Sequence, residues 1–409
     1  MKKNIDIVLF GATGFTGTLC LRYLKNKTSG LKWAIAGRDP VKLQQLGFRH
    51  SVALERLIVD SEDEAALDNM TKRAKVVIST AGPFHKYSDN LVKYCVKNSC
   101  HYVDITGESF WVRQLIDKYH ISAAKKGVRI IPMCGYDSLP SDLGTLFAVK
   151  KMGKPVKKVE AFHTGNGGFS GGTIETMFSM GELDLEDQMG DSFLLNPEGF
   201  VSDIQREESV PIKGIKKVEE VKSWIGPFVM AMVNNLVVRR SAALMEERQE
   251  PYGPDFTYNE YSFFKKPIYA VINTLIMAIS GIVLFTRFGR LFRRFFPKPG
   301  EGPSEETMKN GFFEVLYKVQ AEKGQEQIFR MYGKGDPGYR VTSKLVAESA
   351  LTLIHNLEDL PGGEEYGGVL TPATGLGEPL ISRLKDNEVY FEGPLDENLE
   401  VPEEKKNPS

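Results

Sequence analysis

The sequence predicts an α/β protein whose first 150 residues form a Rossmann-type, doubly wound parallel sheet. Two observations lead to this fold class. Short apolar segments alternate with helical segments from residue 6 to residue 133, a pattern typical of parallel strands joined by helices. The first apolar segment also runs directly into a glycine-spaced turn at residues 8–17 and then into a helix. A dinucleotide-binding site is expected in that context.

The turn reads GATGFTG and places Gly11, Gly14 and Gly17 at the spacing GxxGxxG. The first glycine permits a tight turn, the second lets the backbone approach a phosphate, and the third lets the helix pack closely on the strand. N–H groups at the start of the helix would then bind the pyrophosphate of the cofactor. The other turn residues expected beside the cofactor are Thr13, Phe15 and Thr16. An ordinary strand-to-helix turn without a nucleotide is the alternative.

The alternation also gives the expected positions of the elements. Strands are expected at residues 6–10, 31–36, 56–60, 75–80, 101–105 and 128–133. Helices are expected at 15–27, 90–98, 111–126 and 141–152, and two more should begin at Asp39 and Ser61. The pattern changes after about residue 155, where a strand at 156–164 and a helix at 173–189 are followed by two strands within 311–332. Helices are expected again at 338–355 and within 367–387, before a polar tail at 391–409.

The composition is that of an ordinary globular protein, with 42% hydrophobic residues, 26% charged residues and a formal net charge of −1. This charge balance indicates no nucleic-acid partner. The four cysteines form no CxxC pair and no cluster with histidine. We therefore expect reduced, intracellular thiols, a cytoplasmic location and no metal site.

The end of the second expected strand indicates which cofactor is bound. Sites that prefer NAD usually place Asp or Glu there, to bind the ribose 2′-OH. This chain instead has Arg38, and an arginine can bind a 2′-phosphate with two hydrogen bonds. The sequence therefore favours NADPH (NADP), with a solvated surface arginine as the alternative. Asp60, at the end of the third strand, could contact the adenine or cap the next helix.

The loops after the fourth, fifth and sixth strands should hold the nicotinamide and the substrate, because ligands bind at the carboxyl ends of parallel strands. Tyr136 and Asp137 are the best-placed titratable groups, and a reductase needs a proton donor near the atom that accepts the hydride. The alternative is that Asp137 only forms a turn before the next helix. The expected cofactor contacts in these loops are Ala81, Gly82 and Pro83. The expected substrate contacts are Asp104, Thr106, Glu108 and Ser138.

One segment departs from the soluble pattern. Residues 268–285 contain no charged side chain, and residues 286–296 are basic and aromatic. Eighteen apolar residues are at the short end for a membrane span. A helix that dips into one leaflet, beside a basic interfacial helix, fits the pattern of 268–296. A buried helix of the second domain is the alternative.

Several longer motifs resemble the saccharopine dehydrogenase-like oxidoreductases, in particular their trans-acting enoyl reductase branch. These motifs are GATGFTG, AGRD, AGPF, YVDITGE, CGYDSLPSDLG, YGPDFTYNEY, PGEGPSEE and GGVLTPATGLG. The resemblance covers residues 5–390. It implies an NADP-binding Rossmann domain at 1–150, completed by residues 338–390. It also implies an inserted α+β substrate domain at 151–337, and C-terminal helices that pack back on the first domain.

The resemblance also implies a function in lipid or glycolipid biosynthesis. An enzyme of this branch reduces an enoyl double bond on a chain held by a polyketide or fatty-acid synthase. We expect a lipid or carrier-bound acyl substrate, a membrane or lipid surface contacted through 268–296, and a chain that could form a homodimer. The alternatives are a saccharopine dehydrogenase-type oxidoreductase acting on an amino-acid adduct, and a lipid-surface protein that keeps the fold without catalysis.

Overall fold

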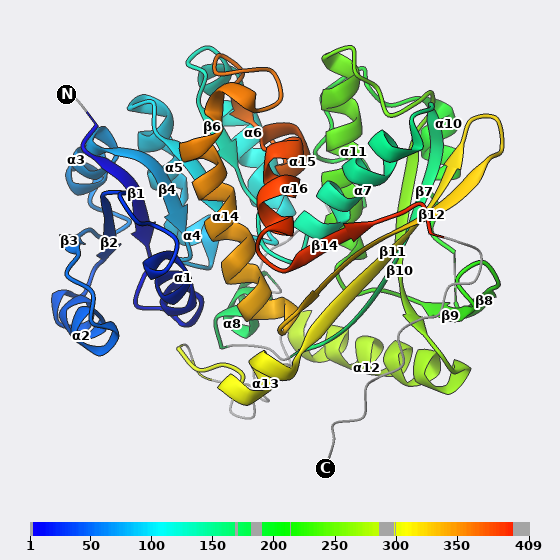
Figure 1. Cartoon of the computed structure of the whole chain (residues 1–409), viewed down its shortest axis with the longest axis horizontal. Helices are drawn as coiled ribbons and strands as arrows, with labels where there is room; N and C mark the ends of the chain where they lie inside the picture. Colours follow the sequence, from blue (N-terminus) through cyan, green and yellow to red (C-terminus); the bar gives the residue numbers. More distant parts are fainter. Residues whose placement is uncertain are drawn as a thin grey trace.

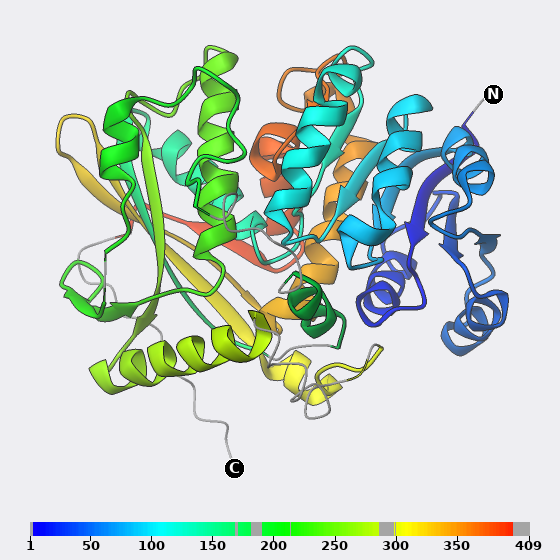
Figure 2. The same ribbon diagram turned by 180° about the vertical axis from the view of Figure 1, so that it is seen from behind.

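The computed structural model of the chain describes residues 3–167, 171–180, 190–212, 214–285, 298 and 300–395. Within these ranges the chain forms two seven-stranded sheets that stand side by side, with helices between and around them (Figure 1). The view from behind shows the N-terminal half of the first sheet and the second sheet at opposite ends of the molecule (Figure 2).

The first sheet is parallel throughout, in the order β13-β6-β5-β4-β1-β2-β3. This order confirms the predicted doubly wound α/β fold. β1 and β4 are mostly apolar and buried because helices cover both faces of the sheet. The strands are β1 (Ile5–Phe10), β2 (Trp33–Gly37), β3 (Glu55–Ile58), β4 (Ala74–Ser79), β5 (His101–Asp104), β6 (Arg129–Ile131) and β13 (Gly368–Val369).

Helices join these strands. The start of α2 shows which residues favour the beginning of a helix. The carboxylate of Asp39 accepts hydrogen bonds from the N–H groups of Val41 and Lys42, each at 3.0 Å. Pro40 occupies the first turn, where no intrahelical N–H bond is needed. The helices are α1 (Phe15–Lys25), α2 (Pro40–His50), α3 (Glu64–Arg73), α4 (Phe84–Tyr87), α5 (Asp89–Lys97), α6 (Ser109–Ala124) and α7 (Leu139–Met152).

The second sheet is mixed, in the order β14-β12-β11-β7-β10-β9-β8. β7 and β10 are parallel, and the other neighbours pair antiparallel. Its strands are β7 (Val156–Asn166), β8 (Lys216–Val218), β9 (Ser223–Gly226), β10 (Thr257–Phe264), β11 (Phe312–Ala321), β12 (Glu326–Lys334) and β14 (Val389–Glu392). The helices that accompany it are α8 (Gly171–Met180), α10 (Asp203–Glu208), α11 (Ala231–Glu247), α12 (Pro267–Phe285) and α13 (Glu305–Asn310).

Helix α7 lies between the two sheets and packs closely on β11. A Cβ added to Gly144 would collide with the Tyr317 hydroxyl group. That hydroxyl donates a 2.8 Å hydrogen bond to the carbonyl oxygen of Pro140. The start of α7 is therefore fixed both to the first sheet, through the preceding loop, and to the second sheet.

The C-terminal part of the chain returns to the first domain, as predicted. α14 (Thr342–His355) packs along α1 and over β4, and β13 extends the parallel sheet beside β6. Asp142 of α7 accepts a 2.7 Å hydrogen bond from the N–H of Ala373. The remaining elements of this part are η2 (Pro337–Val341), η3 (Leu357–Asp359), α15 (Pro372–Gly375) and α16 (Gly377–Lys385).

The sequence placed residues 391–409 in a polar tail, but residues 391 and 392 belong to β14. Val389 and Phe391 are buried, and Phe391 pairs with Met331 of β12. The backbone of this short strand pairs with β12 and so covers its edge. Residues 396–409 of the expected tail lie outside the described residues.

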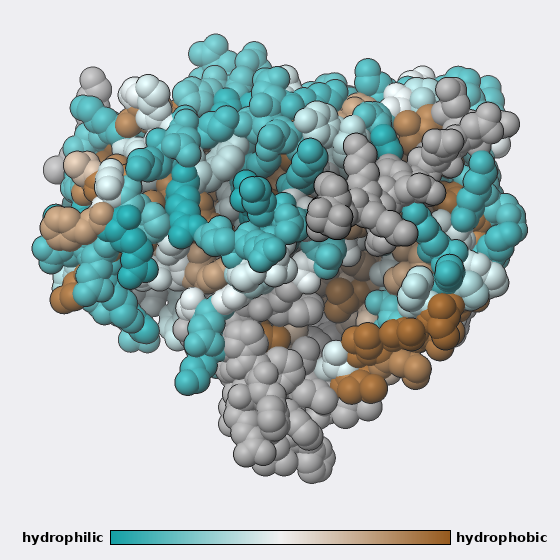
Figure 3. Space-filling view, turned by 60° about the horizontal axis from the view of Figure 1, so that its bottom comes forward, coloured by the Kyte–Doolittle hydropathy of each residue, from teal (hydrophilic) through white to brown (hydrophobic). Residues whose placement is uncertain are grey.

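Helix α12 runs along the lower edge of the second sheet and contacts β9 and β10. Ala270 is buried against these strands, whereas seven apolar side chains are 40–62% exposed. They are Ile268, Tyr269, Val271, Ile272, Leu275, Ile276 and Ile279. They form a continuous hydrophobic surface (Figure 3). Across the described residues, no helix has both the length and the apolar character needed to cross a membrane.

Candidate active site at the carboxyl edge of the parallel sheet

The strand order of the first sheet reverses between β1 and β4, which places a ligand-binding crevice at the carboxyl ends of these strands. Gly11 follows β1 with a φ of +78°, and an added Cβ would lie 2.9 Å from the nitrogen of Ala81. At Gly17 an added Cβ would overlap the carbonyl oxygen of Gly11 and lie 2.9 Å from Ala12 Cα. Neither position has room for a side chain, so α1 starts close against the crevice.

Helix α1 begins at this crevice with Gly14 as its N-cap and without a side-chain cap. The first N–H groups of a helix have no intrahelical acceptor, so they can bind an anion. Thr13 is exposed and Thr16 is half-buried at this end. The ring of Phe15 packs edge to face against Tyr339, with a centroid distance of 5.2 Å. The Phe15 ring is thus used for packing against another part of the chain.

Arg38 follows the last residue of β2, and its side chain is exposed. Among the described residues, no hydrogen bond or ion pair engages its guanidinium group. Asp60 is half-buried beyond β3 and accepts a 3.0 Å hydrogen bond from the N–H of Glu62. The carboxyl end of β2 therefore presents the guanidinium group of Arg38 to solvent, and that of β3 presents the Asp60 carboxylate, which stabilises a turn. The helix cap that follows is Asp63, which accepts a bond from Ala66, and not Asp60.

The loop after β4 is tied to the glycine turn. The Thr80 hydroxyl lies 3.1 Å from the carbonyl oxygens of both Phe10 and Gly11. In the residues that follow, Ala81 is half-buried, Gly82 is exposed and Pro83 is buried. This loop borders the crevice on the side of β4, β5 and β6.

Glu108 is fully buried and holds this loop from the other side. Its carboxylate accepts hydrogen bonds from the N–H groups of Phe84 and His85, each at 2.8 Å. The same carboxylate lies 2.6 Å from Nδ1 of the His85 ring. Nε2 of that ring lies 3.3 Å from the Ser179 hydroxyl on α8. His85 is thereby held between a buried carboxylate and a hydroxyl group contributed by a distant part of the chain.

Asp104 and Thr106 are buried and bonded within the protein. The Asp104 carboxylate accepts hydrogen bonds from the N–H groups of Thr106 and Met133, each at 3.0 Å, and a 2.8 Å bond from the Tyr102 hydroxyl. Burial raises the pKa of Asp104 to about 7. Thr106 accepts a 3.1 Å hydrogen bond from the N–H of Glu108. These contacts join the ends of β5 and β6 and set the direction of the Glu108 loop.

Tyr136 and Asp137 differ in their surroundings. Tyr136 is buried, and its ring packs edge to face against Phe313 of β11, with centroids 5.1 Å apart. Burial raises the pKa of its phenol far above the usual range. The Asp137 carboxyl group is half-buried, and no described residue forms a hydrogen bond with it. Burial raises the pKa of Asp137 to about 6, so its proton can be exchanged near neutral pH.

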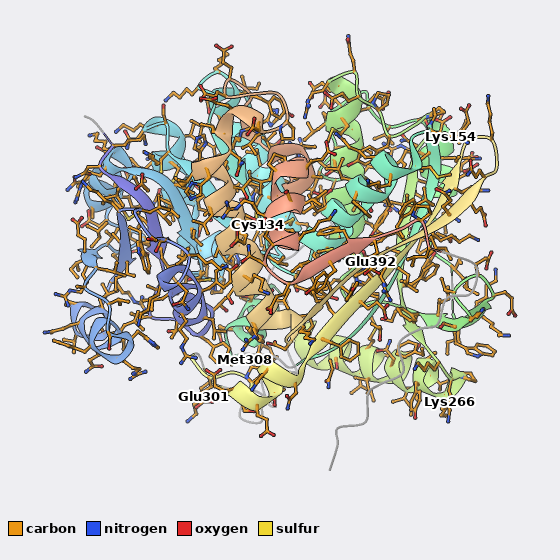
Figure 4. The ribbon with its side chains drawn as sticks, in the orientation of Figure 1. Cys134, Lys154, Lys266, Glu301, Met308 and Glu392 are labelled. Carbon is orange, nitrogen blue, oxygen red and sulfur yellow. The ribbon has the colours of Figure 1, made fainter. Side chains whose placement is uncertain are left out.

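Cys134, at the start of the same loop, lies in the middle of the molecule (Figure 4). Its thiol is completely buried, and burial raises its pKa well above the usual value. A thiolate nucleophile is therefore not expected here.

Ser138 belongs to a buried polar network that joins the loop to the second sheet. Its hydroxyl donates a 2.9 Å hydrogen bond to Asn234 of α11, which donates in turn to Ser141 at 3.1 Å. Ser141 donates a 2.7 Å bond to Glu260 of β10, and His163 Nε2 lies 3.2 Å from the same carboxylate oxygen. The position of the loop therefore depends on residues of the inserted domain.

The structure brings the residues 81–83, Glu108, Asp137 and the glycine turn to one edge of the first sheet. Sequence reasoning missed His85, although it lies two residues after Pro83 in a loop already identified as a cofactor contact. The sequence also did not point to Asn234, Glu260 and His163 as neighbours of this loop, because they lie on other elements and meet it only through the fold.

The geometry fits a dinucleotide with a 2′-phosphate. The turn excludes side chains at Gly11 and Gly17, the start of α1 offers N–H groups, and Arg38 offers a cation at the far end of β2. Bound NADPH would supply a hydride to the part of the crevice above β4, β5 and β6.

Comparison with known proteins agrees with this geometry. Residues 7–131 match the saccharopine dehydrogenase NADP binding domain. A candidate trans-acting enoyl reductase of Mycobacterium tuberculosis is 32% identical, over 93% of this chain and 96% of its own length. A trans-acting enoyl reductase of Mycobacterium bovis is 31% identical, over 94% of this chain and 96% of its own length.

A solved structure shows the same fold. Saccharopine dehydrogenase (L-Glu forming) from Saccharomyces cerevisiae superposes with a TM-score of 0.50, over 95% of this chain and 99% of that one, at 14% identity. The chain therefore belongs to the family of trans-acting enoyl reductases, and it is an NADP-dependent oxidoreductase with a saccharopine dehydrogenase-type cofactor domain.

Proposed function

We propose that this protein uses NADPH to reduce the carbon–carbon double bond of an enoyl thioester. The acyl chain would be lipid-like or held on the carrier of a polyketide or fatty-acid synthase, and the product would enter lipid or glycolipid biosynthesis. The observation that carries this proposal is the relation to trans-acting enoyl reductases along nearly the whole chain.

Different residues of the first sheet would bind different parts of the cofactor. The N–H groups at residues 14–17 would bind the pyrophosphate, and the Arg38 guanidinium would bind the 2′-phosphate. Asp60 would lie on the adenine side, and residues 81–83 would border the nicotinamide. The strand order supports this division, because β2 and β3 lie on one side of the switch point and β4, β5 and β6 on the other.

Asp137 is the residue that we propose as the proton donor. Its carboxyl group has no hydrogen-bond partner among the described residues, and its pKa of about 6 suits proton transfer near neutral pH. Tyr136 would border the substrate with its ring edge. Asp104, Thr106, Glu108 and Ser138 would shape the walls of the site, because each is bonded to another loop.

The exposed face of α12 would bring the enzyme to a lipid surface. Its apolar side chains lie beside the exposed Lys265 and Lys266, the second of which marks the start of the helix in Figure 4. An apolar helix face flanked by cations is typical of helices that lie in the interface of an anionic bilayer. The basic segment at 286–296, which the sequence assigns to the same contact, lies outside the described residues.

A turnover assay tests the proposed reaction. The purified protein would be incubated with NADPH and, separately, an enoyl thioester, a ketone and the imine formed from an amino acid and an aldehyde. We expect NADPH oxidation with the enoyl thioester alone. Oxidation with the imine would favour the saccharopine-type reaction, and no oxidation with any of the three would favour a non-catalytic lipid-surface protein.

A further inference from the structure

The contact between His85, Glu108 and Ser179 joins two distant parts of the chain at the nicotinamide side of the crevice. Glu108 accepts three bonds from residues 84–85, including the 2.6 Å contact with His85 Nδ1. One carboxylate thus fixes both the backbone and the ring of His85. The ring also packs on Phe110 of α6, with centroids 5.3 Å apart. The orientation of Nε2 is therefore set by the fold.

Nε2 is directed toward an oxygen atom in this structure. The Ser179 hydroxyl lies 3.3 Å from it, and the His85 side chain retains 12% of its exposed area. A ring nitrogen that carries a proton donates it to an oxygen acceptor, so Nε2 has the geometry to bind an oxygen at this position. The Ser179 hydroxyl therefore occupies a position where the oxygen atom of a bound substrate would meet Nε2.

The strand order places His85 near the reacting part of a bound substrate. α4 begins directly after the residues 81–83, at the carboxyl end of β4, and Asp137 follows β6. β5 lies between these strands, so their ends are separated by two strand spacings, about 10 Å. A thioester group placed between them would have His85 on one side and Asp137 on the other.

We infer that His85 is a catalytic residue whose Nε2–H group binds the thioester carbonyl oxygen and stabilises the enolate that forms during reduction. This inference rests on the proposed enoyl reduction. A hydride adds to the β-carbon of the enoyl group, the double-bond electrons shift toward the carbonyl, and the negative charge develops on the carbonyl oxygen. The α-carbon then takes the proton of the Asp137 carboxyl group, and a proton from solvent replaces it. Overall, NADPH, one proton and the enoyl thioester give NADP⁺ and the saturated thioester.

Two substitutions distinguish this role from a purely structural one. In His85→Asn, the side-chain amide nitrogen can take the place of Nδ1 beside Glu108, but no donor remains at the position of Nε2. In His85→Gln, the amide nitrogen takes the place of Nε2, and no donor remains at the position of Nδ1. Removal of one donor to an oxyanion typically lowers kcat by roughly 10²–10³-fold. With the crotonyl thioester of N-acetylcysteamine, we expect that loss in H85N and a loss of less than about tenfold in H85Q. The Kd of NADPH should be unchanged in both variants.

A larger loss of kcat in H85Q than in H85N would overturn the inference. A purely structural role requires only the contact with Glu108, so H85N would then remain active and H85Q would lose activity. A second readout is the ring NMR signal of His85, identified by its absence in H85N. We expect this signal to shift when NADP⁺ and the butyryl thioester are added together, and an unchanged signal would also overturn the inference. A wild-type protein that does not reduce the crotonyl thioester would instead contradict the proposed function.

Discussion

Arg38 is the residue through which the choice of cofactor can be tested. It is exposed at the end of β2, and no described residue forms a hydrogen bond or ion pair with its guanidinium group. Its loss should therefore leave the fold intact. A hydrogen bond to a charged group contributes about 1.5–3 kcal/mol, so Arg38→Ala should raise the Kd of NADPH by roughly 10–100-fold and leave that of NADH within about twofold. Fluorescence titration with both cofactors measures this.

The matched control for this substitution is Arg49→Ala, which removes an equally exposed arginine from the last turn of α2. It should leave both Kd values unchanged. An equal loss of NADPH and NADH binding in Arg38→Ala would contradict the assignment of the 2′-phosphate site.

Asp137 determines the expected pH dependence of the reaction. A proton donor must be protonated, and the pKa of Asp137 is raised to about 6 by burial. The rate kcat should therefore be highest below pH 6 and fall about tenfold per pH unit above it. Asp137→Asn should lower kcat by roughly 10²–10⁴-fold and remove this decline. A pH profile of the variant that still falls above pH 6 would assign the proton transfer to another group.

The same raised pKa also affects stability. The folded state holds the Asp137 proton more tightly than the unfolded state, whose carboxyl group has the ordinary pKa. The free energy of unfolding should therefore decrease as the pH rises from that ordinary value to about 6. Denaturant unfolding of Asp137→Asn between these pH values should show a smaller decrease.

Individual residues differ in how far the sequence alone could identify them. The glycine turn could be recognised because its glycine spacing follows from a local steric requirement. The structure leaves no room for side chains at Gly11 and Gly17. The partners of Ser138 and His85 could not, because Asn234 and Ser179 come close only when the inserted domain packs on the first.

Among the elements, helix α12 is predicted to bind a lipid surface through its exposed apolar face. Leu275 and Ile279 lie one turn apart and are 58% and 62% exposed. Replacement of both by lysine should abolish co-flotation with vesicles of phosphatidylcholine and phosphatidylserine, because charged groups would enter the apolar interface. NADPH binding should be unaffected, since the helix contacts the second sheet.

A matched control is Phe48→Lys, on α2 of the first domain, where the wild-type side chain is 74% exposed. This variant should bind vesicles like the wild type. If the double variant also binds them normally, α12 does not mediate the contact, and its apolar face would be assigned to a protein partner instead.

The whole molecule shows why the first domain was easier to predict than the second. Parallel strands covered on both faces leave continuous apolar segments in the sequence, so β1, β2 and β4 to β6 could be located from the pattern of apolar segments. The second sheet combines strands from residues 156 to 392, and its neighbours are set by long-range pairing such as β14 with β12. The last two residues of its edge strand β14 were consequently assigned to the polar tail.

The organisation of the molecule also explains how one reaction could use both domains. α7 and the loop before it are bonded to the second sheet through Ser141 and Glu260, while α14 packs on α1. The cofactor edge of the first sheet therefore lies beside the inserted domain. We expect hydride transfer to take place there.

Transfer of deuterium from NADPH deuterated at C4 of the nicotinamide tests this central claim most directly. The protein would be incubated with each C4 stereoisomer and the crotonyl thioester of N-acetylcysteamine, and the product analysed by mass spectrometry and NMR. We predict a saturated thioester with one deuterium at the β-carbon from one of the two stereoisomers. Deuterium at the carbonyl carbon, or a thioester recovered unreduced while NADPH is bound, would contradict it.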